Sequence, residues 1–235
     1  MSTCVVTGTG SGIGREVAIQ LSKNKQFYNI AMLGRNKKAM EETKSLMDLT
    51  GINVSIWDID LAYPEKISEI IDVIYTETNS IDAVLNIAGY TDPQPLLTTS
   101  LDSMRLTYNI NVFTPLVLIR ECARYMKKNG GKILNVASTA GMTPRPGWIS
   151  YSSSKAAVIS MSSTLSDELA EYGIKVYCIS PGRCATALRK RLAPKEDPTT
   201  IMQPVEVAKI ICNLIDDSEL CLDGQNIIIR KKFEQ

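Results

Sequence analysis

Tyr151 and Lys155 stand four residues apart in the stretch ISYSSSKAAV, with three serines between them. Residues at positions i and i+4 share one face of a helix, so the two side chains would point the same way. They could decorate a solvated helix face, or the lysine could tune the tyrosine. A free tyrosine has a pKa near ~10, and a nearby cation favours its phenolate form. The second interpretation gives a group that exchanges a proton near neutral pH.

The chain contains no histidine, which narrows the chemistry. This excludes His-based catalytic triads, histidine metal ligands and histidine general bases. The six cysteines are scattered and form no CxxC pair, so neither a zinc site nor a disulfide framework is indicated. We expect no metal, and any acid–base step must use tyrosine, lysine, carboxylates or cysteine.

The bulk composition is typical of a soluble globular protein. The 235 residues fit one domain with a substantial core, and hydrophobic residues make up 44% of them. The net charge of +1 gives no global field that would draw the chain to nucleic acid or to a membrane. The first residues show no signal peptide, and no apolar run is long enough to cross a bilayer. We therefore expect a cytoplasmic protein with neither nucleic acid nor membrane as a partner.

Short β-branched runs alternate with helical patterns along the chain. The pattern predicts seven strands, at residues 4–8, 28–35, 53–60, 81–89, 131–138, 174–182 and 224–230. Helices are expected at residues 14–24, 36–51, 63–79, 100–131, 150–173 and 204–218. Continuous apolar strands separated by helices indicate a parallel sheet covered on both faces. We predict the α/β class, with residues 1–235 forming one Rossmann-type, doubly wound domain.

A glycine-rich turn, TGTGSGIG at residues 7–14, joins the first predicted strand to the first helix. Glycines there permit a tight turn and let a pyrophosphate approach the helix N-terminus. Such a turn alone is a weak signal, but its position after the first strand strengthens it. The pattern favours a dinucleotide cofactor.

The second strand ends at Arg35, about 20 residues beyond the turn, where a residue that recognises the ribose is expected. A carboxylate there would favour NAD, and none is present. The guanidinium of Arg35 suits a 2′-phosphate, and Lys37 and Lys38 add positive charge. The alternative is a basic helix start without a binding role. We expect NADP(H) to be favoured over NAD(H), with Asp60 accepting a hydrogen bond from the adenine.

Over nearly its whole length the sequence resembles the short-chain dehydrogenases/reductases. The motifs that carry the resemblance are TGTGSGIG (7–14), NIAG (86–89), Asn111 in NINVFTP, Ser138 in NVASTAG, Tyr151 and Lys155 in YSSSK, and SPGRCAT (180–186). Any one of them could arise by chance, whereas the ordered set is highly specific. The resemblance implies hydride transfer between a nicotinamide cofactor and a carbonyl or hydroxyl group.

The resemblance implies a catalytic role for four residues. Tyr151 would protonate the carbonyl oxygen during reduction, or act as the base in the reverse direction. Lys155 would favour the phenolate of Tyr151 and hold the ribose hydroxyls of the nicotinamide. Ser138 would hydrogen-bond the substrate oxygen, and Asn111 would hold a water that relays protons toward Lys155. For Asn111 the alternative is a residue that only caps or bends a helix.

The resemblance also implies a set of cofactor contacts. We expect residues 86–89 to shape the adenosine wall and brace the sheet, and the stretch after residue 180 to contact the nicotinamide carboxamide. Thr186 could equally be only a helix cap. The expected contacts are Gly8, Ser11, Gly12, Ile13, Gly14, Arg35, Asp60, Leu61, Asn86, Ala88, Gly89, Tyr151, Lys155, Pro181, Gly182 and Thr186.

Three positions depart from the family's pattern. Ile87 stands where the family often has a second asparagine, and Ser11 stands where many NADP-preferring members carry Arg or Lys. The preference for NADP therefore depends on Arg35. The last strand does not run into the family's common glycine pair.

One polar, proline-containing segment, residues 183–204, breaks the alternation, and we expect it to lie over the site as a mobile flap. It carries the basic residues Arg183, Arg189, Lys190, Arg191 and Lys195. Arginines suit a sugar phosphate, and we expect Arg183, Arg189 and Arg191 to contact it. The segment also looks like the reductase modules of bacterial surface-polysaccharide precursor pathways, which reduce a pentulose phosphate. Alternatively, the charges are solvated or pair with Glu196 and Asp197.

The sequence thus predicts an NADPH-dependent carbonyl reductase that acts on a small, anionic carbonyl compound such as a keto-sugar phosphate. A 3-oxoacyl thioester reductase and a general carbonyl reductase are alternatives. A non-catalytic, redox-sensing NADP(H)-binding protein is an alternative from another class. The resemblance implies a homodimer or homotetramer assembled through the helices that carry Asn111 and Tyr151.

Overall fold

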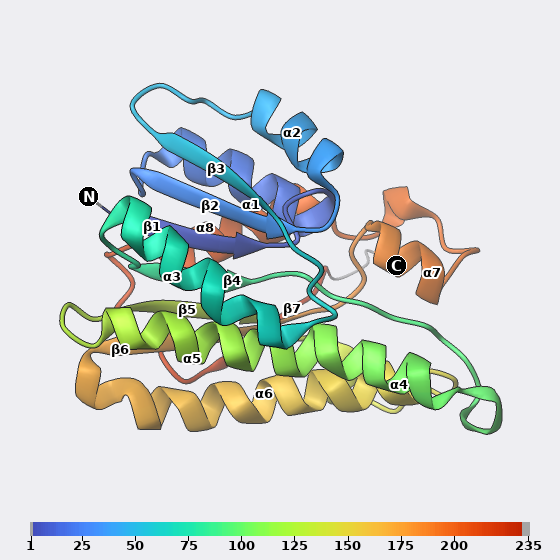
Figure 1. Cartoon of the computed structure of the whole chain (residues 1–235). Helices are drawn as coiled ribbons and strands as arrows, with labels where there is room; N and C mark the ends of the chain where they lie inside the picture. Colours follow the sequence, from blue (N-terminus) through green and yellow to red (C-terminus); the bar gives the residue numbers. More distant parts are fainter. Residues whose placement is uncertain (1, 232–235) are drawn as a thin grey trace.

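The computed structural model of the chain describes residues 2–231. Seven parallel strands form one sheet in the order β3-β2-β1-β4-β5-β6-β7 (Figure 1). The strands are β1 (Thr3–Thr7), β2 (Asn29–Gly34), β3 (Asn53–Asp58), β4 (Ala83–Asn86), β5 (Gly131–Val136), β6 (Ile174–Pro181) and β7 (Asn226–Ile229). The predicted α/β class and doubly wound sheet are confirmed.

Helices cover both faces of this sheet (Figure 1). They are α1 (Gly12–Asn24), α2 (Lys37–Ser45), α3 (Ile67–Thr78), α4 (Leu101–Tyr108), α5 (Thr114–Met126), α6 (Ile149–Leu169), α7 (Ala187–Leu192) and α8 (Pro204–Leu214). Alternate residues of a strand face opposite sides. Val6 accordingly packs in one core cluster with Val17 of α1 and Ile211 of α8, whereas Val5 packs in another with Leu118 of α5. Burial on both faces explains why the strands read as unbroken apolar runs.

The strand order reverses beside β1. The chain builds β2 and β3 on one side of β1 and then crosses to place β4 on the other side. In open parallel sheets, the crevice at such a reversal, at the carboxyl ends of the strands, is where ligands bind. Helix α7 lies at this edge of the sheet (Figure 1).

The predicted continuous helix over residues 100–131 is wrong. The structure breaks it into α4, a π-helical turn η3 (Asn109–Phe113) and α5. Pro115 has no backbone N–H, so it cannot donate to the carbonyl of Asn111 as a regular helix would require. The chain widens at this point instead, and the side chain of Asn111 is buried.

The segment 183–204 also has more structure than the sequence suggested. It contains α7 and a short 3-10 turn, η6 (Pro198–Thr200). Its two ends are joined by a β-bridge between Cys184 and Met202, both of which are buried. The segment is therefore a closed loop anchored at its base.

Within residues 2–231, no helix is both long and apolar enough to span a membrane. The same part of the chain holds no cluster of three or more cysteine or carboxylate side chains that could bind a metal ion.

The buried carboxylate of Glu121 joins α5 to the start of α3. It accepts hydrogen bonds from Arg124 (2.7 Å) on its own helix, from the neighbouring Arg120 (2.7 Å) and from Ser68 (3.3 Å). Burial raises the pKa of Glu121, but the hydrogen bonds from the two arginines lower it more, so the net shift is downward. The folded protein therefore favours the ionised carboxylate.

We predict that Glu121→Gln lowers the free energy of unfolding by about 1–2 kcal/mol at pH 7, since charge-assisted hydrogen bonds are lost while exposed arginines keep their solvent. Because the folded-state pKa is depressed, the stabilisation is complete above the unfolded-state pKa of ~4.3 and is lost as the pH falls through the folded-state value. Urea unfolding at pH 7 and pH 3 should show the difference shrinking in acid. Glu69→Gln, an exposed change on α3, is the control and should stay near wild type. An equal loss at both pH values would contradict the assignment.

Candidate active site

A cavity of about 800 Å³ opens at the carboxyl ends of β1, β4, β5 and β6. Most residues that the sequence singled out line it: Gly8, Ser11, Gly12, Ile13, Gly14, Ala88, Gly89, Ser138, Tyr151, Lys155, Pro181, Gly182, Arg183, Thr186 and Arg189. Arg35, Asp60, Leu61, Asn86, Asn111 and Arg191 are not among the lining residues. The cavity therefore brings together residues that are far apart in the sequence.

At one end of the cavity lies the glycine-rich turn. A Cβ on Gly14 would lie 2.2 Å from the carbonyl oxygen of Gly8, and Gly8 itself has φ +77° and lies against the backbone of Ala88. Thr7 fixes this approach, because its Oγ1 accepts hydrogen bonds from the N–H groups of Ile87 (3.0 Å) and Ala88 (3.1 Å). Only glycine fits at the two close contacts.

The N-terminus of α1 opens into the same space. Its N-cap residue, Ser11, makes no side-chain capping hydrogen bond, so the first N–H groups of the helix are left for an anionic ligand. The turn and the helix end together fit the pyrophosphate of a dinucleotide.

The residues expected to select the nucleotide lie at the neighbouring strand ends. Arg35 is exposed just after β2. Asp60 follows β3, and its Oδ1 accepts a hydrogen bond from the N–H of Ala62 (3.0 Å), while Leu61 is buried. Parallel pairing of β2 with β3 places Arg35 and Asp60 at the same edge of the sheet as the glycine-rich turn.

Asn86 is buried at the end of β4 and braces the sheet. Its Nδ2 donates to Oδ1 of Asn135 on β5 (2.9 Å), and Nδ2 of Asn135 donates to Oγ of Ser162 on α6 (2.9 Å). This chain of side chains ties the sheet to α6. Of the two roles expected for residues 86–89, the structure shows the bracing one for Asn86.

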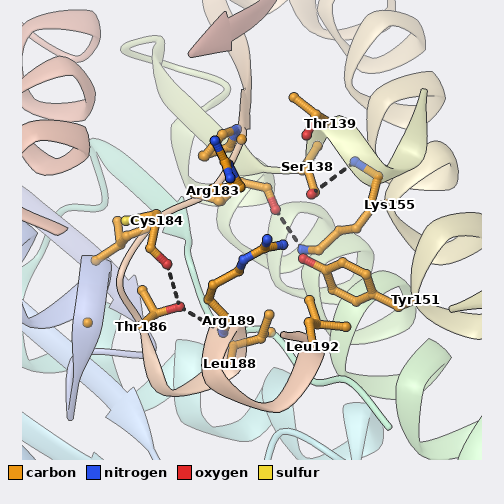
Figure 2. A pocket seen from close by; sticks show the side chains of 18 of the residues that line it. Ser138, Thr139, Tyr151, Lys155, Arg183, Cys184, Thr186, Leu188, Arg189 and Leu192 are labelled. Carbon is orange, nitrogen blue, oxygen red and sulfur yellow. Dashed lines mark hydrogen bonds between the residues drawn. The ribbon is translucent and has the colours of Figure 1, made fainter. Parts of the chain in front are cut away.

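Ser138, Tyr151 and Lys155 converge at the other end of the cavity (Figure 2). Ser138 follows β5 and begins the 3-10 turn η4 (Thr139–Gly141), where its Oγ accepts from the N–H of Ala140 (3.1 Å). Tyr151 and Lys155 lie one turn apart on α6, and both are buried. The Nζ of Lys155 donates to the carbonyl oxygen of Val136 (2.7 Å).

The pKa of Tyr151 does not follow the sequence-based expectation. Burial raises it above its ordinary value, while a hydrogen bond with Ser138 and the charge of Arg189 lower it by less. Lys155 is not among the groups that shift it. The lowering expected from Lys155 therefore does not appear in this structure, because desolvation outweighs the hydrogen bond and the neighbouring charge. At neutral pH the phenol keeps its proton.

Burial acts on Lys155 in the opposite direction. It lowers the pKa of the ammonium from 10.5 to about 8, because the charged form loses its hydration in the protein interior. The single carbonyl oxygen to which Lys155 donates does not compensate for this loss. Lys155 can therefore exchange a proton close to neutral pH, although it remains mostly charged at pH 7.

The side chain of Asn111 makes three hydrogen bonds to protein groups. Its Oδ1 accepts from the N–H of Tyr90 (2.8 Å), and its Nδ2 donates to the carbonyl of Tyr90 (2.9 Å) and to Oγ of Ser154 (2.9 Å). The residue thus ties η3 to α6 and to the strand end after β4. Pro115 cannot donate a hydrogen bond to the backbone carbonyl of Asn111, as the residue four positions on in a regular helix would.

Comparisons with known proteins agree with this geometry. Residues 2–197 match the family model of the short chain dehydrogenases. The chain belongs to the short-chain dehydrogenase family. It is therefore an oxidoreductase of this family, whose members act on hydroxyl or carbonyl groups.

Three proteins similar to this chain are known oxidoreductases or nicotinamide-binding structures. The chain is 30% identical over 233 residues to the 3-oxoacyl-(acyl-carrier-protein) reductase FabG of Chlamydia trachomatis, covering 95% of this chain and 93% of the relative. It also resembles NAD⁺-bound xylitol dehydrogenase (25% identity, TM-score 0.85, covering 97% of both chains). The structure of ElxO with NADP bound is similar too (25% identity, TM-score 0.86, covering 97% of this chain and 96% of that one). Both nicotinamide cofactors thus occur among similar proteins.

In this short-chain dehydrogenase, the segment after β6 closes one side of the cavity with α7 (Figure 2). Thr186 caps α7, because its Oγ1 accepts from the N–H of Arg189 (3.1 Å), and it also lines the cavity. Arg183 and Arg189 line the cavity and both bond to Glu196. Arg191 is exposed and is not among the lining residues.

Sequence reasoning missed the loop between Ser138 and Tyr151. Trp148 lies in the cavity wall with its ring edge-on to that of Tyr151, 6.5 Å between centroids. The guanidinium carbons of Arg145 and Arg189 each lie 5.9 Å from the centroid of the Trp148 ring. The signal was the compact stretch PRPGW, which places an aromatic ring and a cation close to the tyrosine in the sequence.

Gly141 sets the distance between the turn that carries Ser138 and the helix that carries Tyr151. A Cβ at this position would lie 2.7 Å from the backbone N of Ala156 and 2.7 Å from the backbone carbonyl carbon of Lys155. Helix backbone cannot move aside as a flexible side chain could, so the turn must shift.

We predict that Gly141→Ala lowers kcat roughly 100-fold, because a displacement of about 1 Å in a catalytic group has that effect. The free energy of unfolding should fall by about 1–3 kcal/mol from overpacking. Ser138→Ala, which removes the hydroxyl and its capping hydrogen bond without crowding the helix, is the comparison and should lose turnover with a smaller fall in melting temperature. A Gly141→Ala enzyme with wild-type kcat would show that the close contact does not position Ser138.

We also predict that Lys155→Met stabilises the fold at pH 7 by roughly 2–3 kcal/mol, since each pKa unit corresponds to about 1.4 kcal/mol. The depressed pKa of Lys155 means that its burial penalty is complete below about pH 8 and vanishes above the unfolded-state pKa of ~10.4. Urea unfolding at pH 7 and pH 10 should show the advantage of the variant shrinking with pH. Lys128→Met, an exposed change, should show no such trend. A destabilised Lys155→Met protein at pH 7 would overturn the inference.

Proposed function

We propose that this short-chain dehydrogenase is an NADPH-dependent carbonyl reductase in which Tyr151 is the general acid. The observation that carries the proposal is the convergence of Ser138, Tyr151 and Lys155 in a cavity whose other end is a glycine-lined phosphate cradle. The spacing suits a ligand that reaches from the α1 N-terminus to the tyrosine, as an extended dinucleotide does.

The residues of the cleft would hold the cofactor in three places. The turn at Gly8–Gly14 and the N-terminus of α1 take the pyrophosphate, and Lys155 takes the ribose hydroxyls. Pro181, Gly182 and Thr186 take the carboxamide, and Ile13, Ala88 and Gly89 complete the wall. When bound, the reduced nicotinamide supplies a hydride to the carbonyl carbon. The exposed guanidinium of Arg35, with Lys37 and Lys38 beside it, supports a preference for the 2′-phosphate of NADPH.

The protein's own contribution is to place and deliver a proton. A buried Tyr151 with a raised pKa is protonated at neutral pH, which suits an acid that donates to the substrate oxygen during reduction. Ser138 donates a hydrogen bond to the same oxygen as its charge develops. Lys155, with its pKa near 8, then resupplies the proton to Tyr151, and water held at the carbonyl of Asn111 connects Lys155 to solvent.

The substrate we propose is a small anionic ketone, with a keto-sugar phosphate as the leading class. The cavity is lined by Arg145, Arg183 and Arg189 at its open side, which supports an acidic group on the substrate. A 3-oxoacyl thioester is the second candidate, because the 3-oxoacyl reductase of Chlamydia trachomatis matches nearly the whole chain. We propose no partner other than this small molecule and further copies of the chain. We place the enzyme in the cytoplasm.

We propose a homodimer or homotetramer built through α5 and α6. The exposed apolar side chains of Phe113, the last residue of η3, and Leu116 of α5 support this face as an interface.

The experiment is NADPH oxidation against a panel of carbonyl compounds, with NADH run in parallel. The panel pairs ketose phosphates with the same sugars without phosphate, and adds a 3-oxoacyl thioester and a neutral diketone. We expect a phosphorylated ketose to be reduced with a kcat/KM at least tenfold above its unphosphorylated partner, since a bidentate arginine contact is worth about 1.5–3 kcal/mol. Tyr151→Phe should lose turnover of every substrate while retaining its affinity for NADPH.

The other outcomes separate the alternatives. Equal rates with and without phosphate would leave a general carbonyl reductase, and a preference for the thioester would leave a 3-oxoacyl reductase. Tight binding of NADPH with no turnover of any compound would overturn the proposed function in favour of a non-catalytic, redox-sensing protein.

A further inference from the structure

The open side of the cavity carries an unequal set of charges. Arg145, Arg183 and Arg189 lie there with Glu196, which is the one carboxylate among the described residues that line the cavity. The sequence left open whether the flap charges pair with Glu196, and Arg183 and Arg189 do so. Glu196 pairs with Arg189 and not with Arg145, so it does not neutralise both of these guanidinium groups.

Glu196 is held mainly by Arg189. Its Oε2 accepts from Nε of Arg189 (2.5 Å) and its Oε1 accepts from Nη2 (2.7 Å), which is the two-pronged geometry of an arginine–carboxylate pair. Both side chains are mostly shielded, at 19% and 15% exposed. The hydrogen bonds from Arg189 and then the charges of both arginines hold the pKa of Glu196 below its usual value, so the pair is ionised at neutral pH.

Arg189 also reaches the reacting end of the cavity. Its side chain extends from α7 into the cavity, on the side where Tyr151 lies (Figure 2). Its charge is one of the two influences that lower the pKa of Tyr151, and both residues contact the ring of Trp148. An acidic group seated on Arg189 would therefore be within reach of a small molecule whose carbonyl lies at Tyr151.

We propose that Glu196 occupies the binding site of the substrate's acidic group, which we call the anion seat. A ketone bearing a phosphate or carboxylate would displace the Glu196 carboxylate from Arg189. Arg145, on the same Trp148 ring, is the second cation of this seat. The inference rests on the proposed function and deepens it, because it names the residues that select the acidic substrate. A neutral ketone has no group that can take the place of Glu196.

The exchange does not strand a buried charge. When Glu196 leaves Arg189 it keeps Arg183, whose side chain is 42% exposed and bonds to it at 3.2 Å. The carboxylate can thus turn toward solvent with a partner. Arg145 is exposed, and within residues 2–231 no carboxylate lies within salt-bridge distance of it, so it adds attraction without losing an ion pair.

The first test measures binding at the seat directly. The chain has two tryptophans, so Trp57→Phe leaves Trp148 as the only one and makes its fluorescence a local signal. Inorganic phosphate is titrated with saturating NADP⁺ present, which blocks the phosphate cradle at α1. In this background we expect Glu196→Gln to tighten phosphate binding roughly tenfold and Arg189→Gln to weaken it roughly tenfold, the size of one lost charge-assisted contact.

The matched control lies one residue away. Asp197→Asn removes the same charge from the same loop, and asparagine still caps η6, where Asp197 accepts from the N–H of Thr199. This variant should bind phosphate as the parent does. Equal effects of Glu196→Gln and Asp197→Asn would reduce the result to general electrostatics and overturn the proposal.

The second test is kinetic and uses the chain with both tryptophans. Glu196→Gln should lower KM roughly tenfold for a phosphorylated ketose or a keto acid, whichever is the substrate, and leave KM for a neutral diketone unchanged. A rise in KM for acidic and neutral ketones alike would show that Glu196 only orders the loop, and the proposal would fall. If no ketone is reduced, the proposed function fails. The phosphate titration still decides whether Glu196 competes with an anion for Arg189.

Discussion

The close approach of α6 to the carboxyl end of β5 is the contact on which the candidate site depends. At Gly141 the turn after β5 meets helix backbone with no side chain between them. The inner face of α6 is built from serines, and Ser150, Ser154, Ser162 and Ser166 are all buried. A short side chain allows the helix to lie close to the sheet. The hydroxyls of the last three donate to carbonyls of their own helix, so these three polar groups are buried with hydrogen-bond partners.

That close approach has opposite effects on the two titratable residues that α6 carries. Burial favours the neutral form of any group, so it keeps the proton on Tyr151 and weakens the hold of Lys155 on its own. The two pKa values therefore move apart: burial raises the pKa of Tyr151 above its ordinary value and lowers that of Lys155 to about 8, because each group is favoured in its neutral form. A tyrosine that stays protonated beside an amine with a pKa near 8 is suited to donate a proton and to be resupplied. The charge that does favour the phenolate comes from Arg189 on α7, so the flap and the acid are electrostatically linked.

The parts of this arrangement that depend on local geometry could be predicted from the sequence. Spacing of four residues on a helix places Tyr151 beside Lys155, and alternating burial on both faces of β1 produces the apolar run that marks a central strand. A continuous helix was predicted over residues 100–131 although Pro115 lies within it, and the π-turn that buries Asn111 depends on the helices packed around it. The sign of the Tyr151 shift depends on burial depth, which no spacing reveals. The sequence allowed a pairing of the flap charges with Glu196, but the bidentate hydrogen bonds between Arg189 and Glu196 depend on how the chain turns after the short helix α7.

The cavity would hold anions in two physically different ways. At α1, backbone N–H groups and glycines form a cradle that carries no formal charge and would bind phosphate without breaking an ion pair. At α7, the guanidinium of Arg189 already binds a carboxylate of the same chain. A ligand must therefore bind Arg189 more strongly than Glu196 does in order to displace it. The first arrangement suits a cofactor that every turnover uses. The second suits a substrate that must be distinguished from others, because the ligand has to displace the Glu196 carboxylate from Arg189. A neutral ketone cannot do so, and a dianionic phosphate does so more easily than a monoanionic carboxylate.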